Sequence, residues 1–117
     1  MKKTEEKTNA VRILTQKKLR FRTHDYTESS AVSAVEVAQV LGQEPQRMFK
    51  TLVTVGKSGE HHVFMVPVAE ELDLRKAADA VGEKAVHMVK SKELLPLTGY
   101  VRGGCSPIGM KKRLPTV

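Results

Sequence analysis

Two features of the amino-acid sequence could take part in chemistry. Lys50 stands at the start of the apolar run 51–55, where a lysine either lies along the surface to reach solvent or projects its cation into a pocket. On composition alone, we expect the Lys50 side chain to lie along the surface. Residues 98–109 contain four glycines and one proline. The bare backbone N–H groups of such a segment, including those of Gly103 and Gly104, can approach a carbonyl, a phosphate or an oxyanion, although an ordinary tight turn has the same composition.

Metal, thiol and nucleotide chemistry find little support in the sequence. The four histidines form no H-x-x-x-H pair and the single cysteine, Cys105, excludes a C-x-x-C pair, so we expect no metal site. Cys105 could act as a nucleophile with a histidine as its base, but a small residue packed in a tight loop is the better interpretation. Neither G-x-x-x-x-G-K-[ST] nor G-x-G-x-x-G occurs, and we expect no bound cofactor.

The charge of the chain indicates a polyanionic partner. Its 117 residues include 20 Lys plus Arg against 13 Asp plus Glu, which gives a formal net charge of +7 and a pI near 9.7. Nucleic acid is the leading class of partner, with good solubility as the simpler explanation of the same excess. The few aromatic residues are not spaced as a base-stacking platform, so we expect contacts to a phosphate backbone rather than base reading.

The sequence lacks the features of a secreted or membrane-spanning protein. No apolar run approaches the roughly 18 to 20 residues that cross a bilayer, and residues 1–7 are charged, unlike a signal peptide. A lone cysteine cannot form an internal disulfide, which fits a reducing compartment. We therefore expect a cytoplasmic protein without a membrane partner.

Periodicity and capping signals predict the elements of the N-terminal part. A helix is expected after Thr8, which can cap it, and the partial alternation of residues 19–26 suggests a strand. Ser33 and Glu36 form an S-x-x-E capping box for a second helix that ends at Gly42.

The remainder of the chain predicts a hairpin followed by shorter elements. Strands are expected over 51–55 and 63–68, with Pro67 at the edge or end of the hairpin. Asp73 can cap a third helix that Gly82 ends. The other expected elements are a short helical turn from Pro45, a strand over 85–89 and a short helix from Ser91 that breaks near Pro96.

These elements alternate irregularly between helices and strands, without a linker or an internal repeat. A chain of 117 residues with 40% hydrophobic content can bury one core. We therefore expect a single compact α/β domain over residues 1–117, with a mixed, largely antiparallel sheet flanked by helices.

The motifs of this chain, taken together and in their order, resemble those of the YbaK/EbsC family. The likeness runs from Thr8 to Val117, and its most specific parts are K-T-L-V from Lys50 and T-G-Y-x-x-G-G-x-S-P-x-G from Thr98. The other matching residues are Tyr26, Phe49, Pro67-Val68-Ala69, Leu72-Asp73-Leu74 and Gly109-Met110-Lys111-Lys112.

The resemblance implies an aminoacyl-tRNA editing domain, related to the one inserted in bacterial prolyl-tRNA synthetases, that hydrolyses a wrong amino acid from tRNA(Pro). The YbaK type of this family is best matched to the removal of cysteine. A proline site cannot exclude cysteine of similar size, because small apolar differences are worth only ~1 to 3 kcal/mol of binding, so a separate hydrolytic site is needed. Free-standing editors supply that site in trans.

The resemblance also implies roles for individual residues. Lys50 would belong to the pocket for the aminoacylated terminal adenosine, and the backbone at Gly103 and Gly104 would surround the ester. The residues expected to bind substrate are Tyr26, Thr51, Ser106 and Pro107. The cysteine-removing members resemble substrate-assisted catalysts, in which the substrate's own thiol attacks its ester and leaves as a cyclic thioester. The protein then supplies positioning and charge stabilisation, and Cys105 receives no catalytic role.

One departure from the family concerns the C-terminal end of the sequence. The family continues beyond the match at residues 114–116 into another strand and helix, including an aspartate of the pocket, so we expect this strand and helix to be missing here. Either the chain is truncated, or the open sheet edge is completed by another molecule, such as a second copy. Prolyl-tRNA synthetase is a further expected partner. Two alternatives stay open: removal of another amino acid such as alanine from tRNA(Pro), and a non-catalytic module that binds tRNA or the synthetase.

Overall fold

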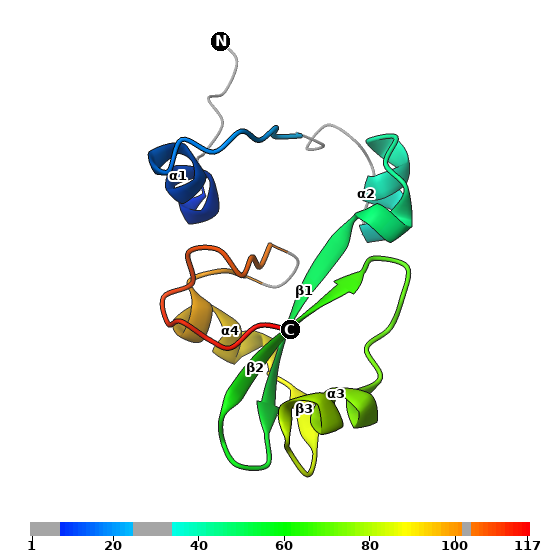
Figure 1. Cartoon of the computed structure of the whole chain (residues 1–117), viewed down its shortest axis with the longest axis vertical. Coiled ribbons are helices and arrows are strands. Elements are labelled where there is room, and N and C mark those ends of the chain that lie inside the picture. The colour runs from blue at the N-terminus through cyan, green and yellow to red at the C-terminus, as the bar shows by residue number, and fades with distance from the viewer. Residues whose placement is uncertain (1–7, 25–33, 102–103) are drawn as a thin grey trace.

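The structure is a computed structural model that describes residues 8–24, 34–101 and 104–117 (Figure 1). Its elements follow the chain as helices, a hairpin and a short third strand. They are α1 (Asn9–Gln16), α2 (Ala34–Val40), the 3-10 helix η1 (Pro45–Arg47), β1 (Phe49–Gly56), β2 (His61–Pro67), α3 (Leu74–Val81), β3 (Val86–Met88) and α4 (Ser91–Thr98).

The predicted hairpin is the centre of the fold. β1 pairs antiparallel with β2 along its length, from Phe49 opposite Pro67 to Val55 opposite His61. β3 pairs antiparallel with the other side of β1, but only along 54–56, so the strand order is β2-β1-β3. Pro67 is the last residue of β2, as predicted, where its missing N–H interrupts no ladder.

The two faces of the hairpin pack against different helices, which lie on either side of it in Figure 1. On one face, Phe64 and Val66 form a core cluster with Ala77 and Ala78 of α3 and with Val86. On the other face, a second cluster is formed by Val53 and Val63 of the hairpin with Leu94 of α4, and Cys105, Met110 and Leu114 pack against it. The clusters are separate because successive side chains of a strand point to opposite faces.

The C-terminal residues pair with the outer edge of β2 in parallel orientation. Val63 donates its N–H to the carbonyl of Pro115 at 2.8 Å and accepts one from Val117 at 2.8 Å, while Met65 donates to the carbonyl of Val117 at 3.0 Å. The sheet is therefore mixed but largely antiparallel. Together with the flanking helices this confirms the predicted fold class.

The helix caps agree with the predictions where the structure describes them. The hydroxyl of Thr8 accepts a hydrogen bond from Val11 N at 3.2 Å, and a carboxylate oxygen of Asp73 accepts from the N–H groups of Arg75 and Lys76, both at 3.1 Å. The helical turn from Pro45 is also confirmed. Ser33 of the predicted capping box lies outside the described residues.

One predicted element is absent from the described residues, and one predicted helix is present but ends later than expected. Within the predicted strand 19–26, the described residues 19–24 form no strand, and Leu19 and Phe21 are 52% and 38% exposed. Alternation alone cannot make a strand there, because the described sheet offers that segment no partner. The helix from Ser91 also continues through Pro96 to Thr98, since proline removes only one backbone hydrogen bond and the Thr98 hydroxyl holds the last turn at 2.8 Å from the carbonyl of Leu94.

No helix in the described part of the chain is both long enough and apolar enough to cross a membrane.

Candidate functional site

The glycine-rich segment follows α4 as a loop closed by hydrogen bonds at its base. The buried Tyr100 donates from its hydroxyl to the carbonyl of Ile108 at 2.6 Å, and its N–H donates to the hydroxyl of Thr98 at 3.0 Å. The carbonyl of Thr98 accepts from Lys111 N at 2.9 Å. The two ends of the loop are thus held together between the end of α4 and the return of the chain toward β2.

Inside this loop, two of the expected polar groups already have partners. Gly104 donates its N–H to the carbonyl of Val101 at 2.9 Å, and the hydroxyl of Ser106 accepts from Ile108 N at 3.1 Å. These bonds shape the loop, and they engage the Gly104 N–H within it. Pro107 follows Ser106 and lines the adjacent pocket. Gly103 lies outside the described residues.

Cys105 lies on the inner side of the same loop. It is half-buried against the cluster of Val53, Val63 and Leu94. Burial raises the pKa of its thiol above the usual value, and hydrogen bonds with Thr98 and Ser106 offset this only in part. A thiol that stays protonated near neutral pH is a poor nucleophile, which supports the expectation that Cys105 is structural.

The structure brings Thr51, but not Lys50, to the loop side of the sheet. Thr51 pairs with Met65 and shares its face with Val53, whose cluster packs against Cys105. Its hydroxyl donates to the Met65 sulfur at 3.3 Å. Lys50 is half-buried on the opposite face, paired with Val66, where the β1 edge lies beyond the reach of β3. Tyr26, expected beside Lys50, lies outside the described residues.

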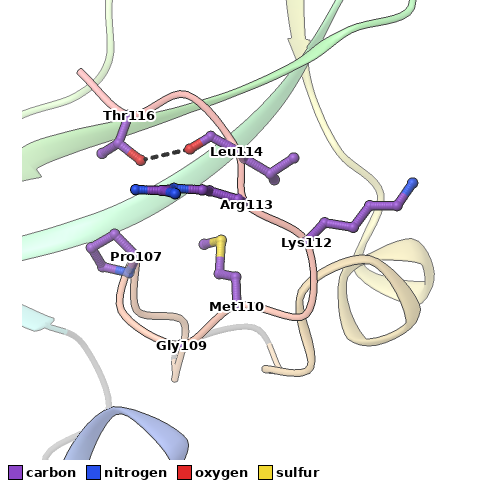
Figure 2. A pocket seen from close by; sticks show the side chains of 7 residues that line it. All are labelled: Pro107, Gly109, Met110, Lys112, Arg113, Leu114 and Thr116. Atoms are coloured by element: carbon purple, nitrogen blue, oxygen red, sulfur yellow. Dashed lines mark hydrogen bonds between the residues drawn. The ribbon is translucent and has the colours of Figure 1, made fainter. Parts of the chain in front are cut away.

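A pocket of about 370 Å³ opens beside the loop (Figure 2). Figure 2 shows the Arg113 side chain extending across it near Pro107, with Met110 pointing into it and Lys112 pointing away. Of the residues singled out in the sequence as substrate-binding, Pro107 lines this pocket. The full lining is Pro107, Gly109, Met110, Lys112, Arg113, Leu114 and Thr116. Sequence reasoning missed Arg113, although the basic run 111–113 directly after the glycine-rich segment was a usable signal.

The N-terminal helix contacts the far end of the loop. Asn9 of α1 donates from its side-chain amide to the carbonyl of Gly109 at 2.7 Å. Gly109 has φ +81, and a Cβ there would lie 2.8 Å from the Asn9 nitrogen and 3.0 Å from the Ile13 Cδ1. The positive φ favours glycine, and a Cβ here would force the Asn9 amide to move. Nothing in the sequence links positions 100 residues apart, so this contact could not be predicted.

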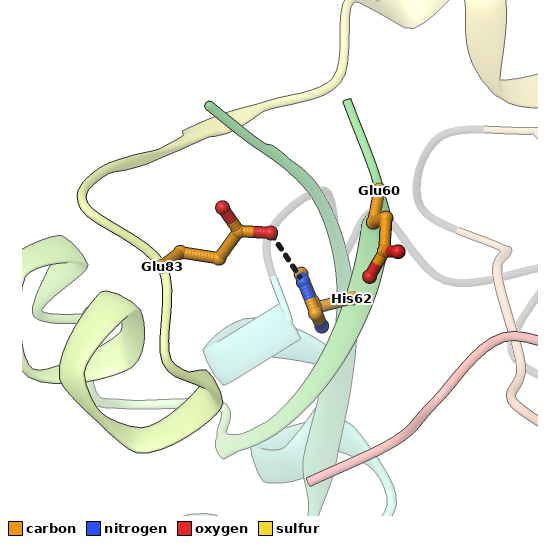
Figure 3. A group of neighbouring side chains, drawn as sticks. All are labelled: Glu60, His62 and Glu83. Atoms are coloured by element: carbon orange, nitrogen blue, oxygen red, sulfur yellow. Dashed lines mark hydrogen bonds and ion pairs between the residues drawn. The ribbon is translucent and has the colours of Figure 1, made fainter. Parts of the chain in front are cut away.

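At the opposite end of the hairpin, three titratable side chains gather near its turn (Figure 3). Ligand atoms of Glu60, His62 and Glu83 lie within 4.8 Å of one another, an arrangement that the sequence spacing did not reveal. The Glu83 carboxylate, however, is already engaged: it accepts from Ser58 N at 3.2 Å and from the Ser58 hydroxyl at 2.5 Å, and it lies 3.0 Å from His62 Nε2. The group is best explained as a network that ties the hairpin turn to the α3–β3 connection.

Gly56 is part of the same network. A Cβ at this position would overlap the carboxyl group of Glu83, so glycine leaves the space that this carboxylate fills. Hydrogen bonding, first from the Ser58 hydroxyl and then from His62, lowers the pKa of Glu83 below its ordinary value, against the opposing effect of burial. The carboxylate is therefore ionised at neutral pH.

Comparisons with known sequences agree with the resemblance inferred from the motifs. The family profile described as the aminoacyl-tRNA editing domain matches residues 28–117. The chain is 50% identical over 116 residues to EbsC of Enterococcus faecalis, described as a candidate Cys-tRNA(Pro)/Cys-tRNA(Cys) deacylase, and the match covers 98% of this chain and 71% of EbsC. It is also 31% identical over 85 residues to a proline–tRNA ligase of Pelobacter propionicus, covering 73% of this chain and 15% of the ligase.

Solved structures give the same result. A candidate trans-editing enzyme for prolyl-tRNA synthetase superposes with a TM-score of 0.67 at 36% identity, covering 75% of this chain and 55% of that one. A hypothetical protein at 20% identity shares the fold with a TM-score of 0.80, covering 93% of this chain and 71% of that one. The chain thus spans only part of the length of the proteins it resembles, and it belongs to the aminoacyl-tRNA editing domain family, as its YbaK/EbsC-like motifs predicted.

Proposed function

We propose that this chain is an aminoacyl-tRNA deacylase that acts in trans and removes cysteine from mischarged tRNA(Pro). The observation that carries the proposal is the 50% identity to EbsC over 98% of the chain, which includes both motif segments. The editing-domain family and the likeness to the trans-editing structure support hydrolysis of a mischarged tRNA as the activity.

The proposed chemistry uses the thiol of the substrate. The cysteinyl sulfur attacks its own ester carbonyl, the ester C–O bond breaks, and the thiol proton passes to the departing ribose oxygen. The immediate product is a cyclic thioester, which water opens to free cysteine. This route needs no nucleophile from the protein, in keeping with the raised pKa of the Cys105 thiol. The protein contributes orientation of the ester and stabilisation of its developing negative charge.

The proposed site lies between the β1 edge, the glycine-rich loop and the pocket beside it. Thr51 and Pro107 already lie on this side, and the backbone of the loop at Gly103 and Gly104 is proposed to surround the ester, with Ser106 shaping it. Lys50 would act from the β1 edge that β3 leaves unpaired, and Tyr26 would complete the adenosine pocket.

We further propose that the basic run beside the loop binds the acceptor end of the tRNA. Lys111, Lys112 and Arg113 are exposed, and Arg113 crosses the pocket of Figure 2, where a guanidinium can bind a phosphate in bidentate fashion. Contacts of this kind position the tRNA without reading its sequence. A cytoplasmic location, association with prolyl-tRNA synthetase and self-association at a sheet edge belong to the same proposal.

The proposal is tested by deacylation assays on four substrates: cysteinyl-tRNA(Pro), alanyl-tRNA(Pro), prolyl-tRNA(Pro) and cysteinyl-tRNA(Cys). The first should be hydrolysed well above the buffer rate, whereas the alanyl and prolyl esters lack a thiol and should not. If recognition is indifferent to the tRNA body, cysteinyl-tRNA(Cys) should also be hydrolysed. If alanyl-tRNA(Pro) were hydrolysed faster than cysteinyl-tRNA(Pro), the chain would be an alanine-removing deacylase instead. Binding of tRNA without hydrolysis of any ester would reduce it to a binding module.

A further inference from the structure

We propose that Tyr100 and Asn9 are positioning residues that fix the backbone of the glycine-rich loop from two sides, so that α1 forms part of the editing site. The inference rests on the proposed function, in that this loop surrounds the ester. Neither residue need touch the substrate, since each acts through a backbone carbonyl at the end of the loop.

The first restraint comes from within the loop. Tyr100 is 9% exposed, and its hydroxyl donates to the carbonyl of Ile108 at 2.6 Å. Burial raises the pKa of this phenol, so it remains a hydrogen-bond donor throughout the physiological pH range. The backbone of Tyr100 is held in turn, because its N–H donates to the hydroxyl of Thr98 at the end of α4. The rigid helix therefore fixes the carbonyl of Ile108 through one aromatic side chain.

The second restraint comes from α1. The amide of Asn9 donates to the carbonyl of Gly109 at 2.7 Å, and the close approach of Asn9 and Ile13 fills the space where any other residue at 109 would carry its Cβ. Asn9 is the first residue of α1, and Thr8 caps this helix, so the amide projects from an ordered backbone.

The two restraints act on consecutive carbonyls, those of Ile108 and Gly109. This pair stands where the loop passes into the wall of the pocket at Met110. Fixing both carbonyls sets the orientation of the peptide planes at this point, and through the bond from Ile108 N to Ser106 it sets the middle of the loop. Backbone groups that stabilise a developing charge must be held to about 0.5 Å, so removal of either restraint should lower turnover more than substrate binding.

The variants Tyr100→Phe and Asn9→Asp test this, because each removes a donor and keeps the shape of the side chain. Thr15→Ala is the matched control on α1, since its hydroxyl donates to the carbonyl of Val11 within its own helix. Thr54→Val is the matched control for a buried hydroxyl, because its bond to the carbonyl of His62 lies away from the loop. The measurements are kcat and KM with cysteinyl-tRNA(Pro), the melting temperature, and hydrogen exchange of the Gly104 and Ile108 amides.

Each loop variant should lower kcat by ~10-fold or more with KM within about threefold, and exchange of the two amides should accelerate. Both controls should keep the wild-type kcat. Thr54→Val should do so even if its melting temperature falls as far as that of the loop variants. The inference is overturned if Tyr100→Phe and Asn9→Asp keep wild-type kcat, or if kcat falls in the controls in proportion to stability. If the wild-type chain hydrolyses no ester, the proposed function fails. Hydrogen exchange then still decides whether the two restraints hold the loop, and unchanged exchange would overturn the inference.

Discussion

Lys50 and Thr51 are consecutive residues of β1 and lie on opposite faces of the sheet, Thr51 with the glycine-rich loop and Lys50 with α3. The family resemblance places both against the same substrate. A site that uses both must therefore wrap around the edge of β1, along the stretch that β3 does not cover. The stem of a lysine is long and flexible enough to reach around a strand edge, which a short side chain could not do.

We predict that Lys50→Ala lowers deacylation of cysteinyl-tRNA(Pro) by ~10² to 10³ while the fold remains intact, because one preorganised charge contact at a reacting ester is worth about that factor. The stem of Lys50 is only half-buried, so stability should change by less than ~1 to 2 kcal/mol. Single-turnover rates and melting temperatures provide the measurement.

Lys57→Ala is the matched control for this variant, because Lys57 is an exposed lysine in the hairpin turn. It should deacylate like the wild type. A wild-type rate for Lys50→Ala would place Lys50 on the surface and remove it from the site.

Replacement of Cys105 should have little effect on turnover. Cys105→Ser and Cys105→Ala are expected to keep deacylation within a few-fold, since the attacking thiol belongs to the substrate and burial raises the pKa of the Cys105 thiol. The small residue also packs against Val53 and Val63, so a modest drop in melting temperature is expected. A ~10³-fold slower reaction with the fold intact, or an acyl-enzyme trapped by rapid quenching, would instead identify a protein nucleophile.

Affinity for tRNA should depend steeply on salt through the basic run beside the pocket. Replacing Lys111, Lys112 and Arg113 by glutamine should weaken binding equally for tRNAs of different sequence. The slope of log affinity against log salt should become shallower by about one for each phosphate that the variant no longer neutralises. Equilibrium binding at several salt concentrations gives the slope.

A control with the same change of net charge replaces three exposed cations on the α3 side of the molecule, Lys57, Arg75 and Lys84. This variant should bind tRNA more tightly than the variant of the basic run. Equal weakening in both variants would mean that binding depends on net charge rather than on the basic run.

The network around Glu83 predicts an acid-sensitive contribution to stability. The pKa of Glu83 is lowered in the folded state, chiefly by the Ser58 hydroxyl, so the folded chain takes up a proton less readily than the unfolded chain. The stabilisation is present above the unfolded pKa of about 4.5 and disappears as the pH falls through the folded value. Glu83→Gln should therefore lower the melting temperature at pH 7 and flatten its decline below about pH 5.

Glu93→Gln is the control for Glu83→Gln, because Glu93 is an exposed glutamate on α4. It should melt with the wild-type pH dependence. If the melting temperatures of Glu83→Gln and the wild type declined in parallel with acid, the network would contribute no charge-dependent stability.

The parts of the fold that could be predicted from sequence are those set by local chemistry. The caps at Thr8 and Asp73, the β-branched hairpin strands and the proline at the end of β2 each depend on residues close in sequence, and each was found as predicted. The strand over 19–26 was predicted from alternation, but a strand also needs a neighbour to pair with, and its described part has none in this fold.

The candidate site was predictable in its motif residues but not in their arrangement. The order of motifs identified the family, and the alternation of a strand places Lys50 and Thr51 on opposite faces. Which of the two faces the glycine-rich loop depends on how the loop and helices pack against the sheet. The Asn9–Gly109 contact joins the two ends of the chain, and the Glu83 network joins a hairpin turn to the end of a helix. Both depend on how the elements pack, which local sequence does not encode.

Catalysis by the substrate thiol is tested most directly by comparing cysteine with serine on the same tRNA. Wild-type chain is mixed in excess with cysteinyl-tRNA(Pro) or seryl-tRNA(Pro), and disappearance of the ester is followed over time against buffer alone. The cysteinyl ester should disappear rapidly and the seryl ester should decay near the buffer rate, because a hydroxyl cannot replace the attacking thiol. No acceleration for the cysteinyl ester, or equal acceleration for both esters, would contradict substrate-thiol catalysis.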